Sequence, residues 1–548
     1  MRRPPIRQAG GAMTRRALLR GSALAGAGLA TGLLPRRAFA QQTAPAIVTS
    51  ERALPQLPYG VQAGDLAGDR AIIWAAADRP ARMRIEWATG DSFADARSVI
   101  GPAALEDTGF TAKFDLGGLP PGQQIVYRVR MVDLADASLV SEPVEGSFRT
   151  PPAARRPIRF LWSGDVAGQG WGINPDWGGM RIFETMRRLE PDFFIHSGDT
   201  IYADDPIAAE QAMPDGGVWK NVTTEAKAKV AETLAEFRGN FAYNLLDDNL
   251  RRFAAQVPML VQWDDHDVSD NWYPRESFAG DPGKAAYTVT SAALLGARAA
   301  RAFQEWMPVR WDRTAWPHLY RRFAYGPSLE IFRIDMRSYR GPNTDGRETA
   351  LSGAARILGA AQLSWLKRAL LASSATWKVI AADMPIGLVV WDDFRARRGA
   401  DAVAQGDDGP PLGRELEFAD LLRFIRDSEI RNVVWLTADV HYTAAHYYDP
   451  NQARFQEFAP FWEFVSGPLN AGTFGPGELD PTFGPQLAFA KAPPAGQFNL
   501  PPSAGLQFFG QVDIDADEVM TVTLKDLAGA ALFSRTLEPE RDGAAAPR

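Results

Sequence analysis

The chain has no cysteine and only five histidines in 548 residues. The lack of cysteine excludes disulfides, thiolate metal sites and cysteine nucleophiles. Because imidazoles are so few, any metal site has to rely mostly on oxygen ligands, which hard cations prefer. A formal net charge of −7 argues against a protein that coats nucleic acid or binds an acidic membrane surface, because both tasks need excess positive charge. We therefore expect no nucleic acid as a structural partner.

Long uncharged apolar runs are also missing after the N-terminus, so we expect no transmembrane segment in the mature protein. Residues 1–40 resemble a twin-arginine export signal. Arg15 and Arg16 precede a mildly apolar Gly/Ala-rich stretch, and residues 38–40 (Ala-Phe-Ala) offer a small-residue cleavage site. A signal anchor or a disordered basic tail is the alternative. The pattern predicts a periplasmic or secreted protein that the twin-arginine export machinery carries in folded form.

The sequence after residue 40 divides into three parts. Residues 41–56 are rich in Pro and Ala and predict a spacer. Between residues 57 and 150, apolar and charged residues alternate, as at Met83, Ile85 and Trp87, and Pro/Gly turns separate the alternating stretches. Such alternation predicts a small all-β sandwich of the fibronectin or immunoglobulin type. A Pro-rich linker then leads into the third part, residues 157–535, where we expect the catalytic domain.

This third part contains five short apolar runs that each end at an aspartate. They occupy residues 158–165, 193–199, 259–265, 377–383 and 433–439. Runs of this kind predict strands buried on both faces, and helical periodicity between them predicts a largely parallel sheet covered by helices. Alternating stretches near residues 512 and 522 predict antiparallel edge strands. The Ala/Lys/Glu-rich insert 205–233 predicts a surface helix or a lid.

The aspartates that end these runs point to a metal site. They are Asp165, Asp199, Asp265, Asp383 and Asp439. In open α/β sheets, ligands bind beyond the carboxyl ends of the strands. Five acids gathered at that edge would repel one another unless a positive group lay between them. Metal is the simplest such group.

Three further residues near these aspartates carry suitable chemistry. Tyr202 follows the second run, where its phenolate could bind a hard trivalent ion such as Fe³⁺, although it could instead only cap the junction of strand and loop. His441 follows the fifth run by two residues and is a ligand-type side chain. His266 stands directly after the third run and is free to act as a proton donor. We expect the other histidines to be structural; they are His196, His318 and His446.

These motifs, in this order, resemble those of the calcineurin-like metallophosphoesterases. The set comprises Gly164-Asp165-x-x-Gly168, Gly198-Asp199-x-x-Tyr202-Ala-Asp204, Asp264-Asp265-His266-Asp267 and Ala438-Asp439-x-His441. Within that superfamily the chain resembles the PhoD-type alkaline phosphatases, which are relatives of the purple acid phosphatases. The resemblance implies an α/β fold, an αββα metallophosphoesterase-like sandwich, preceded by a small all-β domain.

The resemblance also implies a ligand set for two metals. By it, Fe³⁺ is held by Asp165, Asp199, Tyr202 and His441, and a second metal shares Asp199 and takes Asp265, Asp383 and Asp439. Asn271 could replace or join Asp265. Purple acid phosphatases typically place asparagine and two histidines at the last three positions. Three carboxylates there form an oxygen-only set that favours Ca²⁺, with Mn²⁺ or Zn²⁺ as the alternative second metal. Some PhoD-type members use a cysteine as an iron ligand, and in this chain Asp165 takes that place.

The reaction that the resemblance implies is hydrolysis of a phosphate ester by metal-activated water, with His266 protonating the leaving alkoxide. It predicts a secreted alkaline phosphatase, a phosphomonoesterase with phosphodiesterase activity, for small-molecule, lipid or polymer phosphate esters. The alternatives are a phosphodiesterase or phospholipase D-type hydrolase of the same fold and an inactive envelope-binding protein. Arg238, Arg337 and Arg340 are candidate contacts of the phosphate or of the metal ligands, and structural ion pairs would explain them equally well.

Overall fold

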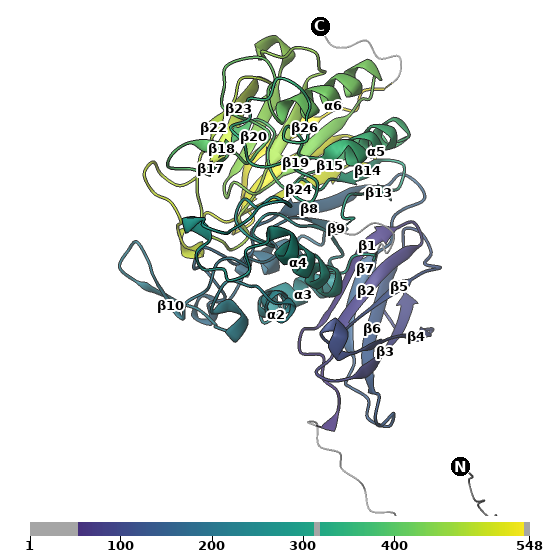
Figure 1. The fold of residues 1–548 in the computed structure, drawn as a ribbon. Helices are drawn as coiled ribbons and strands as arrows, with labels where there is room; N and C mark the ends of the chain where they lie inside the picture. Colours follow the sequence, from purple (N-terminus) through teal and green to yellow (C-terminus); the bar gives the residue numbers. More distant parts are fainter. Residues whose placement is uncertain (1–52, 312–317, 542–548) are drawn as a thin grey trace, which may run out of the picture. The chain divides into compact units, whose positions relative to one another are not determined.

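The computed structural model describes residues 53–311 and 318–541, so the expected export signal of residues 1–40 lies outside the described residues. Two large β-sheets lie against each other, and helices cover their outer faces (Figure 1). These four layers confirm the predicted αββα sandwich. Within the described ranges, no helix has the length and apolar character needed to span a bilayer.

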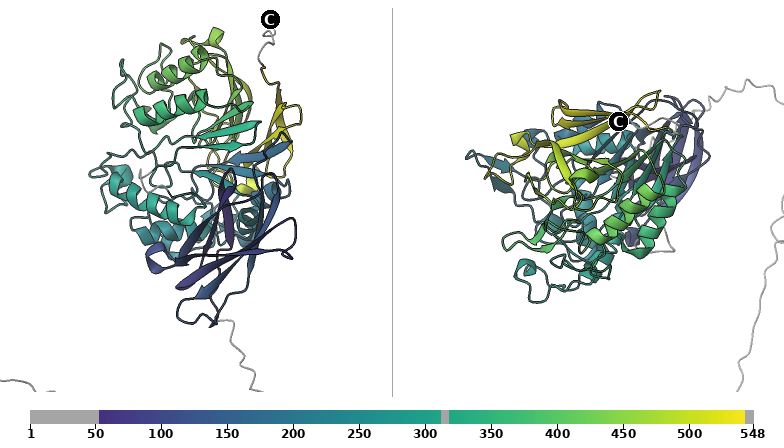
Figure 2. Two further views of the ribbon diagram at one scale, coloured as in Figure 1. Left: turned by 90° about the vertical axis from the view of Figure 1, so that its right-hand side faces the viewer. Right: turned by 90° about the horizontal axis from the view of Figure 1, so that it is seen from above.

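The first large sheet has nine strands in the order β26-β25-β24-β8-β9-β12-β1-β2-β5. Its central strands are β8 (Ile158–Ser163), β9 (Phe193–Ser197) and β12 (Met259–Gln262), which run parallel. The C-terminal strands are β24 (Phe508–Ile514), β25 (Met520–Asp526) and β26 (Ala531–Leu537). They are antiparallel and extend the sheet beside β8, as their alternating sequence predicted (Figure 2).

The second large sheet has seven strands in the order β13-β14-β15-β19-β21-β20-β23. Its strands are β13 (Arg321–Tyr325), β14 (Leu329–Arg333), β15 (Trp377–Ala381), β19 (Val433–Thr437), β20 (Thr443–Tyr448), β21 (Phe461–Val465) and β23 (Pro485–Lys491). β14, β15, β19 and β21 are parallel. The five predicted runs therefore become β8, β9, β12, β15 and β19, and each strand begins at the first residue of its run.

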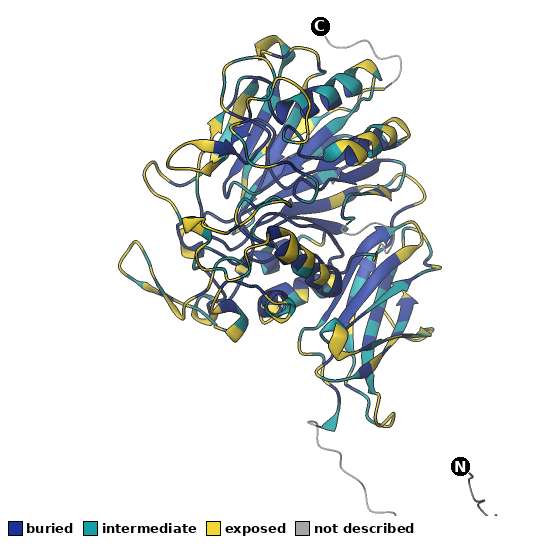
Figure 3. Cartoon of the chain, in the orientation of Figure 1, coloured by how far each residue is buried: buried dark blue, intermediate teal, exposed yellow. Residues whose placement is uncertain are grey.

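Three apolar clusters hold the layers together. Between the sheets, Phe160 and Phe193 stack at 4.8 Å and belong to one cluster with Ile331, Val379 and Val434 of the second sheet. The helices α1 (Arg181–Arg187), α2 (Leu234–Asn244), α3 (Asp248–Gln256) and α4 (Ala292–Trp306) cover the first sheet. The helices α5 (Gly359–Leu371) and α6 (Glu415–Asp427) cover the second. The strands are mostly buried and the outward faces of the helices exposed (Figure 3).

The N-terminal β region shares a sheet with the α/β part. β3 (Ala81–Thr89), β4 (Arg97–Ala104), β6 (Gln124–Asp133) and β7 (Val144–Arg149) form a separate four-stranded sheet. β1 (Val61–Ala67), β2 (Arg70–Ala76) and β5 (Thr111–Leu116) instead continue the nine-stranded sheet, because Gly64 of β1 pairs with Met259 of β12. A Cβ on Gly64 would lie 2.6 Å from the Met259 carbonyl oxygen, so only glycine permits this pairing. The expected boundaries at 57–150 and 157–535 stay predictions.

The insert 205–233 forms a hairpin in place of the expected surface helix. Its strands are β10 (Glu210–Ala212) and β11 (Val218–Lys220), and a single 3-10 turn follows at Glu225–Lys227. Gly216 at the hairpin turn has a φ of 85°, a conformation that breaks a helix and suits a tight turn. The Ala/Lys/Glu composition was therefore a poor guide to this segment.

Glu518 ties the two large sheets together at the end opposite the strand-end aspartates. One of its carboxylate oxygens, Oε1, accepts hydrogen bonds from Thr376 Oγ1 at 2.7 Å, Arg155 Nε at 2.8 Å and Ser328 Oγ at 3.1 Å. Ser328 and Thr376 precede strands of the second sheet, whereas Glu518 lies in the turn between β24 and β25 of the first.

Replacing Glu518 with alanine should lower the free energy of unfolding by about 2 kcal/mol, because three donors lose a charged acceptor. The midpoint of urea denaturation measures this change. Asp517→Ala, at an exposed position of the same turn, is the matched control and should cost less than about 0.5 kcal/mol. Equal effects of the two substitutions would contradict the role assigned to Glu518.

Candidate metal centre

The strand-end aspartates of each sheet lie at one edge. β8, β9 and β12 are parallel neighbours in the first sheet, and β15 and β19 are parallel neighbours in the second. The carboxyl ends within each sheet therefore point the same way, and the two edges meet. Potential ligand atoms that follow β8, β9 and β12 of the first sheet and β19 of the second form three groups, and within each group these atoms lie within 4.8 Å of one another.

The backbone turns sharply at these strand ends. Asp165, Asp199 and Asp439 have φ values of 64°, 47° and 66°. Asn271 and His441 share the left-handed conformation, with φ values of 54° and 58°. Non-glycine residues rarely adopt this region, aspartate and asparagine tolerate it best, and such residues cluster at functional sites. The turns direct each side chain across the edge of the sandwich rather than onward along its strand.

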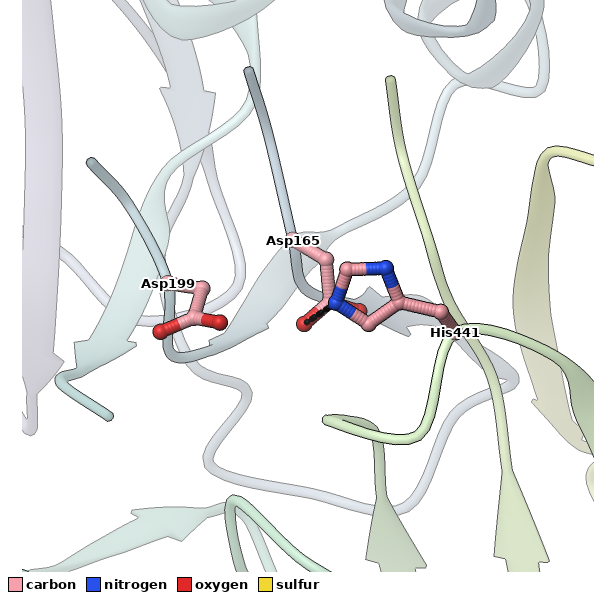
Figure 4. A group of neighbouring side chains, drawn as sticks. All are labelled: Asp165, Asp199 and His441. Carbon is pink, nitrogen blue, oxygen red and sulfur yellow. Dashed lines mark ion pairs between the residues drawn. The ribbon is translucent and has the colours of Figure 1, made fainter. Parts of the chain in front are cut away.

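The first group of potential ligands contains Asp165, Asp199 and His441 (Figure 4). All three side chains are buried. His441 Nε2 lies 3.7 Å from Asp165 Oδ1 and 2.9 Å from the hydroxyl oxygen of Tyr202. His441 Nδ1 contacts the carbonyl of Gly472, and a proton held there leaves Nε2 as the free ligand atom. Burial lowers the pKa of His441 to about 4, so the ring is neutral at physiological pH, as ligation requires.

Two glycines make room for this group. A Cβ on Gly168 would lie 2.2 Å from the ring of Tyr202, and one on Gly467 would lie 2.1 Å from Asp165 Oδ2. Both distances are far below a normal contact, so any larger residue would displace Tyr202 or Asp165. The glycine of the first motif therefore serves the close approach of Tyr202.

A second group lies beside the first. It contains Asp264, Asp265 and Asp439, and a third group joins Asp199, Asp265 and His266. Asp199 and Asp265 therefore each belong to two groups, which is what a position between two cations would require. The backbone amide of Asn271 donates to Asp265 Oδ2 at 2.7 Å and fixes the orientation of that carboxylate.

The guanidinium of Arg337 serves the second group as a fixed counter-charge. The side chain is fully buried, and Nη1 binds both carboxylate oxygens of Asp401 at 3.0 and 2.9 Å. Its Nε also donates to the carboxylate of Asp264. Asp265, Asp383 and Asp439 each have a carboxylate oxygen 3.6 Å from a guanidinium nitrogen of Arg337. Arg340 also pairs with Asp401, at 2.9 Å, so both arginines are tied to this buried aspartate.

His266 stands where the groups open into a cleft. Its Nδ1 contacts both carboxylate oxygens of Asp204 at 2.9 Å, and its ring stacks on Tyr202 with centroids 4.4 Å apart. Burial alone would lower the pKa of His266, but the charges of Asp204, Asp265 and Asp199 outweigh it and raise the pKa well above 6.5. The ring is thus held in place and charged, as a proton donor must be.

The carboxylates at the site are poorly compensated by the protein itself. The oxygens that have no hydrogen-bond donor among the described residues are both oxygens of Asp165 and Asp383 and one oxygen each of Asp199, Asp264 and Asp265. Burial, with the repulsion of neighbouring aspartates added, raises the pKa of Asp165, Asp199, Asp383 and Asp439 well above 3.8. Buried carboxylates are normally paired or bound to metal. The donor set and these oxygens fit a cation site.

Two residues that support the site were not among the predicted ligands. Asp267 accepts hydrogen bonds from the amides of Asp264, Ile201 and Thr200 at 2.9, 3.1 and 3.4 Å, and so fastens the loop after β9 to the loop after β12. It is part of the third motif but not of the predicted ligand set. Asp401 lies outside every motif, and only the structure reveals it.

The structure places the remaining candidates as follows. Arg238 is not a phosphate contact, because its guanidinium binds Glu305 at 2.6 and 2.8 Å and the carbonyl of Asp107. His446 lies in a buried network with Glu463 and Tyr448. His196 is buried in the core, but its Nδ1 has no partner among the described residues. The backbone of Asn271 donates to Asp265 and accepts from Asn343, and its side chain stays a predicted ligand.

Comparisons with known proteins show which family the chain resembles. The family model for PhoD-like phosphatases matches residues 160–524, and the model for the N-terminal domain of PhoD-like phosphatases matches residues 41–152. Alkaline phosphatase D of Bacillus subtilis (strain 168) is 27% identical over 440 residues, which cover 76% of this chain and 70% of that protein.

Two solved structures share the fold. The structure of PhoD superposes with a TM-score of 0.63 at 20% identity and covers 89% of this chain and 93% of its own. The purple acid phosphatase PPD1 from yellow lupin (Lupinus luteus) seeds superposes with a TM-score of 0.53 at 12% identity and covers 88% of this chain and 74% of its own. Since the first family model spans more than half of the 548 residues, the chain belongs to the PhoD-like phosphatases, which are phosphoester hydrolases.

Proposed function

We propose that this phosphoesterase is an alkaline phosphatase that hydrolyses phosphate monoesters, with phosphodiesterase activity at the same site, and that it uses an Fe³⁺/Ca²⁺ pair. The observation that carries the proposal is the set of buried aspartate oxygens, at the edge where the two sheets meet, for which residues 53–311 and 318–541 supply no hydrogen-bond donor. Such oxygens need cations, and cations at this place are what a phosphoesterase requires. Membership of the family argues against the inactive binding protein considered above.

The first cation would be held by Asp165, Asp199, Tyr202 and His441, whose ligand atoms converge. Burial, followed by the charges of Asp199 and Asp165, raises the pKa of Tyr202 well above 10. A hard, highly charged ion would reverse this effect by stabilising the phenolate. This favours a trivalent ion over a divalent one at the first position.

The second cation would share Asp199 and take Asp265, Asp383 and Asp439, with Asn271 as a further candidate. These ligands are all oxygens, which favours Ca²⁺ over Zn²⁺. Arg337 already supplies one positive charge beside them. A divalent ion is therefore sufficient where the first position calls for a trivalent one.

Side chains of the protein supply the proton for the leaving group and position the reacting groups. Bound cations would screen the charge of the phosphoryl oxygens and lower the pKa of a coordinated water. His266 gives its proton to the leaving oxygen, and Asp204 holds the ring in position and keeps it charged. Asp267, Asp401 and Arg337 keep the carboxylates in place before substrate arrives.

A cleft of about 1130 Å³ opens beside His266 and favours the additional diesterase activity, because it leaves room for a second ester substituent. Export through the twin-arginine pathway belongs to the same proposal. It rests on Arg15, Arg16 and the cleavage-site residues 38–40.

Asp199→Asn should reduce kcat/KM for a simple aryl phosphate by at least about 10³-fold, because a carboxylate between two cations is lost. Elemental analysis should show fewer than two metals per chain. Asp215→Asn, at an exposed turn of the β10–β11 hairpin, is the control and should keep both the rate and the metals. Parent-level turnover by the Asp199 variant would refute the bridging role.

Tyr202→Phe should remove the visible absorption expected of a tyrosinate–iron bond in the wild-type protein. The substitution removes only the hydroxyl oxygen, so circular dichroism should stay unchanged. Absorption spectra and iron content are measured on the same samples. A colourless wild-type protein that contains stoichiometric iron would rule out Tyr202 as a ligand.

Asp204→Asn should lower kcat about 10²-fold for esters with alkyl leaving groups, because these need the proton from His266. Hydrolysis of p-nitrophenyl phosphate should fall much less, because p-nitrophenolate leaves without a proton. His266→Ala should show the same pattern more strongly. A uniform loss for all leaving groups would mean that Asp204 has only a structural role.

A further inference from the structure

The cleft beside His266 is lined by an excess of acidic side chains. Among its lining residues, aspartate and glutamate outnumber lysine and arginine by seven to three. His266 and Asp204 form part of its wall. Because His266 faces the leaving oxygen in the proposed function, the leaving group of a bound ester extends into this cleft. The present inference rests on that proposed function.

Three of these acids are not neutralised by partners. Glu276, Asp281 and Asp392 form no ion pair with lysine or arginine among the described residues. Burial raises the pKa of Glu276 to about 7; Lys284 opposes this shift, and Asp392 and Asp281 add to it. The acids are thus close enough to influence one another. At pH 8.5 Glu276 is therefore mostly ionised.

Two of the three basic side chains that line the cleft, Arg398 and Lys284, already interact with neighbouring groups of the protein. Arg398 pairs with Asp393 at 3.4 Å. The ammonium of Lys284 donates to the hydroxyl of Ser269 at 2.9 Å and to the carbonyl of Asp270, and it lies 5.3 Å from the ring centre of Phe278. The cleft therefore presents a negative field to whatever enters it.

An exposed aromatic ring adds to this chemistry. Phe394, on the hairpin of β17 (Trp391–Asp393) and β18 (Arg398–Ala400), is 82% exposed and lines the same cleft. Aromatic faces attract organic cations. The ring and the neighbouring carboxylates are the combination that recognises an organic ammonium group.

We infer that the outer cleft selects phosphate esters by the charge of the leaving group, favouring cationic leaving groups and disfavouring anionic ones. The metal positions bind the phosphoryl group of every substrate alike. Selection therefore depends on what lies beyond the ester oxygen, where Glu276, Asp281, Asp392 and Phe394 stand. Polyanionic esters are poor substrates for this reason.

The test compares three esters of similar size at pH 8.5 and low salt, with Ca²⁺ in excess. They are phosphocholine, 2-hydroxyethyl phosphate and phosphoglycolate, whose leaving groups are cationic, neutral and anionic. The wild-type kcat/KM should be at least about tenfold higher for phosphocholine than for phosphoglycolate. High salt should reduce that ratio, because the field is screened.

The double variant Glu276→Gln/Asp392→Asn should reduce the phosphocholine-to-phosphoglycolate ratio at least about threefold. Asp91→Asn/Asp95→Asn makes the same change in net charge at exposed positions between β3 and β4, outside the cleft lining, and should leave the ratio unchanged. A ratio near one in the wild type, or one that both double variants change equally, would overturn the inference while the hydrolase assignment stands. If none of the esters is hydrolysed by metal-replete enzyme, the proposed function fails and this inference with it.

Discussion

The repulsion among buried carboxylates at the meeting edge of two sheets is the constraint on which the site depends. Burial makes each negative charge costly, and every neighbour adds to the cost. The positive charges of Arg337 and Arg340 offset part of this energetic cost. Both side chains pair with Asp401 in a fully buried cluster. Among the described residues, the carboxylate oxygens of Asp165 and Asp383 have no hydrogen-bond donor, which suits these oxygens to bind cations.

The backbone conformation at the strand ends supports this arrangement of carboxylates. Left-handed residues at the strand ends redirect Asp165, Asp199 and Asp439, and Gly168 and Gly467 clear the space that their neighbours fill. Glycine and aspartate at these positions follow from the backbone geometry as much as from the chemistry. Strain of this kind persists only where the surrounding structure holds it, and here two packed sheets and their helices do so.

The sequence predicted the strands well because both the strand and its end were encoded locally. An apolar run that stops at an aspartate specifies a buried strand and a polar edge within eight residues, and all five runs became parallel strands. Features that depend on distant partners could not be predicted in this way. Asp401 stands in an irregular loop, and its importance comes from Arg337 and Arg340, which lie 64 and 61 residues away in the chain. The joining of β1 to β12 depends on one glycine that fits beneath two carbonyls, and the insert 205–233 follows its turn glycines rather than its helix-favouring composition.

The two halves of the site also differ in charge in a way that bears on the metals. Near the first group, the described residues supply no lysine or arginine ion pair to Asp165 or Asp199. His441 is kept neutral by its lowered pKa, and the positive charge that acts on both aspartates is that of His266. Near the second group, Arg337 lies 3.6 Å from each of Asp265, Asp383 and Asp439. The first group thus combines two carboxylates with a histidine, whereas the three carboxylates of the second group face a permanently charged guanidinium. In the proposed function, the divalent ion would lie on the side of this guanidinium and the more highly charged ion beside Tyr202.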